Sequence, residues 1–261
     1  LPEKVAVIGG GYIGLELGIA LRRLGSEVTV IEGLDKVMAI FDDELRRPLT
    51  TWLRKNDVKT HTNCLAQGAE VKDVKVELTW KDAEGEMQSE TFDKVLVTVG
   101  RRPNTQGWGL ENMGLRMDVD GRFIRIDNQC KTSMKGVYAI GDVSGEPMLA
   151  HRASAQGEMV AEIIAGHKRI FDPVAIPAIV FTEPEIVSVG LTPDEAKEAG
   201  EDIITGKFPL AANGRALTME AEKTGGFVRV VARASDHVIL GVQATGSLSL
   251  IHISEPTRRY R

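Results

Sequence analysis

The chain has 261 residues, of which 43% are hydrophobic and 26% are charged, and its formal net charge is −5. These values are ordinary for a water-soluble globular protein with room for two or three domains. The negative charge offers no basic surface for nucleic acid, and no apolar run approaches the ~20 residues of a membrane helix. We therefore expect neither a nucleic-acid partner nor a membrane association.

The chain begins at Leu1-Pro2 without a methionine or a signal-peptide pattern, so we expect it to be a piece of a longer, cytoplasmic protein. Its two cysteines, Cys64 and Cys130, do not have C-x-x-C spacing, and no His/Cys/Asp cluster has metal-ligand spacing. Two free thiols and no metal site are therefore expected.

Residues 5–32 have the pattern of a complete βαβ unit. Two short apolar runs, residues 5–8 and 28–31, are typical of buried parallel strands. The turn after the first run matches G-x-G-x-x-G and consists of Gly9, Gly10, Gly11, Tyr12, Ile13 and Gly14. In this motif Gly9 permits the tight turn, Gly11 lets a pyrophosphate approach the backbone, and Gly14 lets the helix press on the strand.

The helix that follows the glycine turn is predicted to be amphipathic. Its spacing places Ile13, Leu17, Leu21 and Leu24 on one face, and Gly25 is expected to end it.

The second strand ends in Glu32, about 20 residues beyond the glycines, where a carboxylate can accept both ribose hydroxyls of NAD. The helix N-terminus supplies N–H groups and a positive dipole end for the pyrophosphate. Glu32 would repel a 2′-phosphate, and no arginine follows it before Arg46, so the sequence predicts NAD rather than NADP. The alternative is a structural βαβ unit without a ligand, which the agreement of strands, glycines, helix and acid disfavours.

The rest of this first domain should complete an α/β fold. Residues 42–56 have a helical pattern that contains Pro48, so we expect a helix that is kinked or begins late. Two stretches alternate apolar and polar residues, which is typical of antiparallel strands with one solvated face, and one is a continuous buried run. Strands are predicted at residues 58–62, 74–80, 86–92 and, for the buried run, 95–99.

Two further motifs resemble the class I flavin-dependent pyridine nucleotide-disulfide oxidoreductases. Residues 98–105, T-V-G-R-R-P-N-T around Gly100, resemble the exit from the NAD domain of that family. Residues 137–142, V-Y-A-I-G-D, resemble its second flavin motif, a strand that ends in Gly141-Asp142. The resemblance implies that Asp142 hydrogen-bonds a ribityl hydroxyl of FAD, whereas taken alone the pair would be an ordinary strand-end turn.

The two motifs occur in the same order as in the family, and the segment that follows the second one also resembles the family. In the family, backbone groups at the start of the next helix contact the flavin ring. The resemblance assigns this role to Met148, Leu149, Ala150 and His151. A helix over residues 153–165 should follow, and the resemblance gives His151 a backbone role rather than acid–base chemistry.

A third segment begins after the prolines at positions 173 and 177. Thr192, Pro193 and Glu195 form a capping-box pattern, and Gly200 should close the short helix. Strands are predicted at residues 178–182, 186–190, 226–232 and 239–244. The K-F-P and N-G-R-A pieces at residues 207–209 and 213–216 resemble the dimerisation domain of the dihydrolipoamide dehydrogenase branch more than that of glutathione or mercuric reductases.

The resemblance also implies what the parent enzyme does. Family members carry a C-x-x-x-x-C redox pair and an N-terminal flavin motif before this region, and a His-x-x-x-x-Glu dyad near the C-terminus. The resemblance implies that the parent oxidises dihydrolipoamide with FAD and NAD. Because none of these motifs occurs in the chain, we expect the isolated chain to be inactive. Glu16 is placed on the first helical turn, and the family pairs an acid here with a lysine beside the redox cysteines.

The predicted fold is α/β, with a Rossmann-type NAD-binding domain at residues 1–99 and the C-terminal part of an FAD-binding domain at 100–172. A truncated α+β dimerisation domain follows at 173–246. Residues 247–261 are expected to be a non-native tail, because they resemble a translated transposon-end sequencing adapter.

The resemblance implies a homodimer in the parent protein and the lipoyl domains of a 2-oxo acid dehydrogenase complex as partners. The alternatives are another enzyme of the family, of mercuric reductase or transhydrogenase type, and a non-catalytic NAD-binding module.

Overall fold

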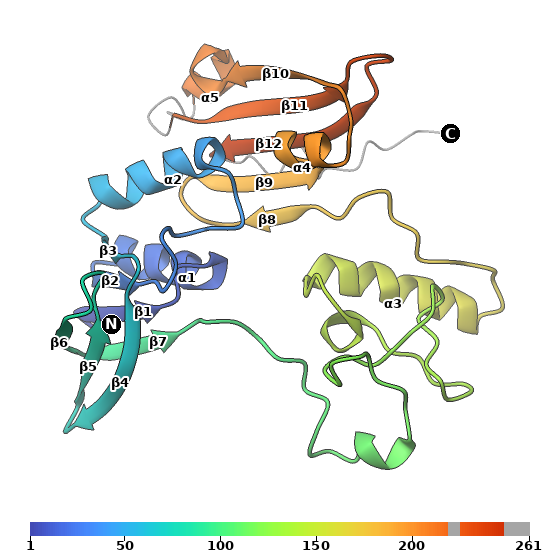
Figure 1. Cartoon of the computed structure of the whole chain (residues 1–261), viewed down its shortest axis with the longest axis horizontal. Helices are drawn as coiled ribbons and strands as arrows, with labels where there is room; N and C mark the ends of the chain where they lie inside the picture. The colour runs from blue at the N-terminus through green and yellow to red at the C-terminus, as the bar shows by residue number, and fades with distance from the viewer. Residues whose placement is uncertain (219–224, 248–261) are drawn as a thin grey trace. The chain divides into compact units, whose positions relative to one another are not determined.

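The computed structural model describes residues 1–218 and 225–247, and the predicted tail at 247–261 lies almost entirely outside them. The chain divides into two compact units. The first unit joins Leu1–Val99 with Pro177–Arg261, and the second is Gly100–Ile176 (Figure 1).

The first unit contains a four-stranded parallel sheet in the order β3-β2-β1-β7. Its strands are β1 (Lys4–Ile8), β2 (Glu27–Ile31), β3 (Lys59–His61) and β7 (Lys94–Val97). Helices α1 (Tyr12–Arg23) and α2 (Asp43–Lys55) cross between successive strands and share one core cluster with β1 and β2. This is the predicted βαβ arrangement, and it places the glycine turn at the carboxyl end of β1.

The face of α1 that packs on the sheet differs from the predicted one. Leu17 and Leu24 are 47% and 67% exposed, whereas the buried residues are Gly14, Leu15, Gly18 and Ile19. A Cβ on Gly18 would be in ordinary contact with the Val28 side chain at 3.4 Å, whereas a Cβ on Gly14 would lie only 2.2 Å from Gly9 O, so Gly14 sets how closely the helix approaches the strands. The glycines therefore define the contact face, and the leucine spacing does not.

Helix α2 begins at Asp43 and runs through Pro48, so the late start is not observed. Asp42 caps it, because its carboxylate accepts the N–H of Leu45 at 2.9 Å. Strand β7 also differs from the prediction of a buried run through residue 99. It ends at Val97, which is 68% exposed, because β7 is the edge strand of this sheet.

The other face of the parallel sheet carries an antiparallel meander. It consists of β4 (Leu65–Lys72), β5 (Lys75–Lys81) and β6 (Met87–Phe92), of which β4 has no counterpart among the predicted strands. Leu78, Trp80 and Phe92 pack against Ala6 and Ile31 of the parallel sheet. The alternating residues of β5 and β6 therefore have one buried and one exposed side, as predicted.

The C-terminal segment of the first unit forms an antiparallel sheet in the order β10-β11-β12-β9-β8. Its strands are β8 (Ala178–Val180), β9 (Glu185–Gly190), β10 (Ile203–Pro209), β11 (Phe227–Arg233) and β12 (Ile239–Gly246). Three short helices, α4 (Pro193–Glu198), η3 (Leu210–Ala212) and α5 (Gly214–Thr218), connect them. The capping box of Thr192 and Glu195 is formed as predicted, with Pro193 in the first turn of α4.

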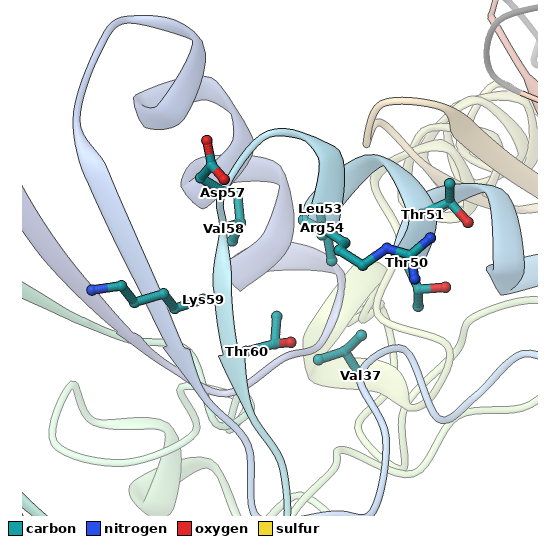
Figure 2. Close-up of a pocket in the computed structure, with 9 residues that line it drawn as sticks. All are labelled: Val37, Thr50, Thr51, Leu53, Arg54, Asp57, Val58, Lys59 and Thr60. Carbon is teal, nitrogen blue, oxygen red and sulfur yellow. The ribbon is translucent and has the colours of Figure 1, made fainter.

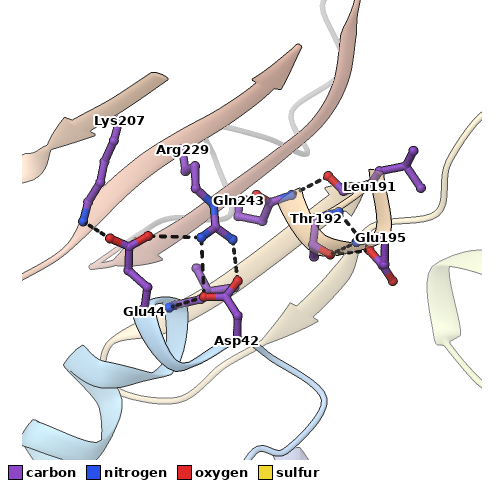
Figure 3. A network of polar contacts seen from close by, with 9 residues as sticks. Asp42, Glu44, Leu191, Thr192, Glu195, Lys207, Arg229 and Gln243 are labelled. Carbon is purple, nitrogen blue, oxygen red and sulfur yellow. Dashed lines mark hydrogen bonds and ion pairs between the residues drawn. The ribbon is translucent and has the colours of Figure 1, made fainter. Parts of the chain in front are cut away.

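Helix α2 meets this antiparallel sheet through a cluster of charged and polar side chains, which we call the Arg229 cluster (Figure 3). It consists of Asp42, Glu44, Lys207, Arg229 and Gln243. Apolar contacts accompany it, since Val180, Ile186 and Phe227 belong to the same core cluster as α2. Residues from opposite ends of the sequence therefore build one core.

The second unit contains α3 (Ala150–Ile164) and two short 3₁₀ turns, η1 (Leu110–Met113) and η2 (Gly141–Ser144). The predicted strand at residues 137–140 is not formed. Tyr138 makes an isolated bridge with Lys131, flanked by two backbone hydrogen bonds of 3.0 Å that join Thr132 to Val137 and Ala139 to Cys130, and the pairing does not extend into a strand. Within the residues that the structure describes, no helix is long and apolar enough to cross a membrane.

The buried face of α1 gives a stability prediction. Leu15→Ala should lower the free energy of unfolding by about 2–5 kcal/mol, because it removes a side chain that is 1% exposed. Leu17→Ala, on the exposed side of the same helix, is the matched control and should change stability by only about 0.5 kcal/mol. Urea denaturation followed by circular dichroism measures both, and a larger loss for Leu17→Ala would contradict the observed helix face.

Candidate functional site

The glycine turn lies where three strands meet. Gly9 donates its N–H to Ile31 O at 2.9 Å, and Thr98 donates its N–H to Ile8 O at 2.8 Å. The Thr98 hydroxyl lies 2.9 Å from Ile8 O and 3.1 Å from Gly9 O, within hydrogen-bonding distance of both. The turn is therefore anchored to β2 on one side and to the end of β7 on the other.

Gly9 and Gly14 are required by packing. Gly9 has a φ of +102°, and a Cβ there would lie 2.6 Å from Thr98 O. A Cβ on Gly14 would lie 2.2 Å from Gly9 O and 2.5 Å from Thr98 Oγ1. All three distances are far below van der Waals contact, so only glycine lets α1 start this close to β1.

Gly11 is in a different situation, because no atom lies within 4 Å of the position of its Cβ. It is the N-cap of α1, and within the described structure no side chain caps it and no acidic residue occupies the first turn. The first N–H groups of a helix have no intrahelical acceptor, and they carry its positive dipole end. The open space at Gly11 is therefore suited to an anion such as a pyrophosphate.

Glu32 bridges the glycine turn and the turn after β2. Its Oε2 accepts the N–H of Gly10 at 2.5 Å, and its Oε1 accepts the N–H of Leu34 at 2.8 Å. Gly10 O in turn accepts the N–H of Met38 at 2.9 Å. The side chain is partly exposed, and each carboxylate oxygen retains a second acceptor site for a ligand hydroxyl.

Glu16 is not at the start of α1 as predicted. It is the fifth residue of the helix, and its Oε1 accepts the N–H of Phe181 at 2.8 Å. The carboxylate therefore lies against the segment that leads out of β8, where it binds a backbone group.

The residues of the predicted flavin motifs lie together in the second unit. Asp142 Oδ2 is 3.3 Å from Nη1 of Arg101. The other terminal nitrogen of this guanidinium, Nη2, donates to Met148 O. Gly141 has a φ of +71° and donates its N–H to the buried Gln156 side chain at 2.8 Å. Gly100, with a φ of +130°, begins the unit.

Residues 148–151 form the entry to α3. Met148 is buried, Leu149 is the N-cap, Ala150 is the first helical residue and His151 is exposed. Within the described part of this unit, no side chain caps Leu149 and no acid lies in the first turn of α3. Just before the helix, Met148 donates its N–H to Glu146 Oε2 at 3.1 Å and Leu149 donates its N–H to Pro147 O at 3.0 Å.

Four residues support these motifs without having been predicted as site residues. Thr98 and Arg101 lie inside the T-V-G-R-R-P stretch at residues 98–103. The hydroxyl and the cation close to Gly100 were the sequence features that could have marked them as site residues. Arg152 is 8% exposed and donates to Gly145 O at 2.7 Å, and Gln156 is 1% exposed. Both occur on α3 as polar residues on its buried side, a position that the spacing does not reveal.

A cavity of about 530 Å³ lies elsewhere, between the C-terminal half of α2 and the edge strand β3 (Figure 2). Its cations, Arg54 and Lys59, extend in different directions, so they do not converge on one ligand group. Val37, one of its lining residues, also packs against Gly10 of the glycine turn. The cavity is therefore adjacent to the glycine turn without being the space at Gly11.

The two cysteines are buried free thiols. Burial raises the pKa of the Cys64 and Cys130 thiols, which leaves little reactive thiolate at neutral pH. Among the described residues, no group of three or more His, Cys, Asp and Glu side chains could hold a metal ion.

Comparison with known proteins gives a consistent result over most of the chain. The family model of the pyridine nucleotide-disulphide oxidoreductases matches residues 1–157, and that of their dimerisation domain matches residues 176–255. A dihydrolipoyl dehydrogenase of Pseudomonas aeruginosa is 52% identical over 246 residues, which cover 94% of this chain and 51% of that protein. The dihydrolipoyl dehydrogenase of Geobacillus stearothermophilus is 46% identical, with 94% and 52% covered. The chain spans about half the length of the curated relatives it matches.

Solved structures are similar over the same range. LpdA from Mycobacterium tuberculosis has a TM-score of 0.85 at 29% identity, with 97% of this chain and 54% of that chain covered. The HOCl-induced flavoprotein disulfide reductase RclA from Escherichia coli has a TM-score of 0.84 at 27% identity, with 95% and 56% covered. The predicted α/β fold class is therefore confirmed.

The unequal surroundings of the glycines give a second prediction. Gly14→Ala should lower the free energy of unfolding by about 1–3 kcal/mol, because the added Cβ meets backbone and cannot be accommodated without displacing α1. Gly11→Ala is the matched control, and it should change stability by less than about 1 kcal/mol. Equal losses in chemical denaturation would contradict the geometry described for the turn.

Proposed function

The chain belongs to the pyridine nucleotide-disulphide oxidoreductase family, and from this premise we propose that it carries the NAD site and part of the FAD site of a dihydrolipoamide dehydrogenase. The observation that carries the proposal is the open, uncapped helix start at Gly11 beside the Glu32 carboxylate. In this proposal residues 1–99 bind NAD, residues 100–172 belong to the FAD domain, and residues 173–246 belong to the dimerisation domain.

The NAD site is proposed to consist of Gly9, Gly10, Gly11, Tyr12, Ile13, Gly14 and Glu32. The N–H groups at the start of α1 would hold the pyrophosphate, since the cradle at Gly11 has room for it. Glu32 would accept the ribose hydroxyls with the acceptor sites that Gly10 and Leu34 leave open. Gly100, the first residue of the second unit, is proposed to contact the cofactor as well.

The residues of the second unit also fit FAD. Asp142 would accept a ribityl hydroxyl, with Arg101 holding the carboxylate in place. Met148, Leu149, Ala150 and His151 would present their backbone to the flavin ring at the uncapped start of α3. Bound flavin supplies a two-electron relay between a dithiol substrate and NAD.

For the whole protein we propose oxidation of dihydrolipoamide through a disulfide, with hydride transfer to NAD. The identities of 52% and 46% to two dihydrolipoyl dehydrogenases, against 27% to RclA, favour this branch. Within the described residues Cys64 and Cys130 are buried and cannot serve as the redox pair. We therefore expect the chain alone to bind nucleotide without turning over dihydrolipoamide.

The partners follow from the same proposal. The match to the family's dimerisation domain supports a homodimer of the parent protein. Lipoyl domains of a 2-oxo acid dehydrogenase complex would deliver the substrate, and the protein would act in the cytoplasm.

Nucleotide titration tests the proposed site. The unmodified chain should bind NADH more tightly than NADPH, because a 2′-phosphate would meet the Glu32 carboxylate. Glu32→Ala should weaken NADH binding by about 1.5–3 kcal/mol, the usual value of hydrogen bonds to a charged group, and should narrow the preference. Glu27→Ala removes an exposed carboxylate from β2, the strand that Glu32 follows, and should leave both affinities unchanged.

Two results would contradict this proposal. Equal affinity of the unmodified chain for NADH and NADPH would refute the role of Glu32. Failure to bind either nucleotide, with the fold intact by circular dichroism, would refute the NAD site itself.

A further inference from the structure

Resting on the NAD site proposed above, we infer that Arg229 is a positioning residue for the glycine turn, although it lies on the antiparallel sheet. The structure links the Arg229 guanidinium to Gly10 through Asp42 and the segment 33–41. Each step of this link is a hydrogen bond or a buried contact.

The first step is the Arg229 cluster itself. Arg229 is 6% exposed, and its guanidinium donates to both oxygens of Asp42, to Glu44 Oε2 at 3.1 Å and to Gln243 Oε1 at 3.0 Å (Figure 3). Lys207 binds the other oxygen of Glu44. Although burial favours protonation of Asp42, its bonds to Arg229 hold its pKa below the ordinary value, and Lys207 lowers the pKa of Glu44. A buried cation that loses its carboxylates is strongly destabilised, so the cluster fixes Asp42 firmly.

The second step is the start of α2. Asp42 uses its Oδ1 to cap the helix at Leu45, and its carbonyl accepts the N–H of Arg46 at 3.1 Å. Asp42, together with Glu44 in the first turn, thus ties the start of α2 to the antiparallel sheet. A displaced Asp42 side chain would leave the helix uncapped and free to shift.

The third step leads from Asp42 to the glycine turn over only a few residues. Phe41 donates its N–H to Met38 O at 3.0 Å, and Met38 donates its own to Gly10 O at 2.9 Å. Both side chains are at most 6% exposed, and the Val37 side chain lies only 2.7 Å from where a Cβ of Gly10 would be. Val37, Met38 and Phe41 are therefore the buried part of the segment, and they connect Asp42 to Gly10.

The last step joins Gly10 to the ligand site. The Gly10 N–H is held by Glu32 Oε2, the carboxylate proposed to bind the ribose. Loss of the Arg229 cluster should let the segment 33–41 and the Gly10 peptide sample more conformations. Binding would then have to restore their order at a cost in affinity.

The test uses the full 261-residue chain and measures dissociation constants well below the unfolding midpoint of every variant. Arg229→Met, which keeps an apolar stem without the charge, should bind NADH about five- to twentyfold more weakly, within the usual range of coupling between sites. ADP-ribose should lose the same factor, because the effect is on the ribose and pyrophosphate end. Arg229→Lys, which keeps the charge, should recover part of the loss.

Arg233→Met is the matched control. Arg233 lies on the same strand and pairs with Glu201 and Asp236, but these partners do not lead to the glycine turn. It should leave both dissociation constants unchanged. If Arg229→Met does not fold, Asp42→Asn replaces it, since an asparagine still caps α2 and loses only the charge that binds Arg229.

The outcomes separate this inference from the proposed function. Weaker binding of both ligands to Arg229→Met or Asp42→Asn, with Arg233→Met unchanged, supports the positioning role. Lower unfolding temperatures with unchanged dissociation constants would show that Arg229 acts on stability alone and would overturn it. If the unmodified chain binds neither NADH nor ADP-ribose, the NAD site fails instead.

Discussion

The close approach of α1 to β1 is the constraint on which the first unit depends. A Cβ on Gly14 would lie too close to Gly9 O and Thr98 Oγ1 for any side chain to be accommodated. This contact aims the start of α1 at the carboxyl end of the sheet and brings Gly10 within reach of Glu32. Packing and ligand geometry therefore share their residues here. The same glycines that close the core leave an uncapped helix end facing open space.

The sequence predicts this region well because the motif is local. The strand, turn, helix and acid lie within 32 residues, and each glycine has a steric reason that holds in any fold of this kind. The capping box at Thr192 and Glu195 is equally local and is formed. In contrast, the face of α1 depended on which of two spacings the sheet would accept. Leu15 is buried and Leu17 is exposed, because the contact at Gly14 decides which face of α1 packs on the sheet.

Long-range pairing explains what could not be predicted. The segment expected to be a strand at residues 137–140 pairs with its neighbour only at the Tyr138–Lys131 bridge, and Val97 of β7 is exposed because β7 is an edge strand. Arg229 has an unremarkable local sequence, yet it binds two acids at the start of α2. Glu16, expected at the helix end, instead binds the backbone of Phe181. Such contacts arise only when segments far apart in the chain meet.

The separation of 187 residues between Asp42 and Arg229 has a consequence for biosynthesis. At 5–20 residues per second, a ribosome needs roughly 10–40 s to reach Arg229 after Asp42 has been made. During most of this interval Val180, Ile186 and Phe227 have not yet been made, so the apolar side of α2 that they cover lacks these contacts. The nascent first unit therefore exposes an apolar surface during this interval, and surfaces of this kind are what chaperones bind.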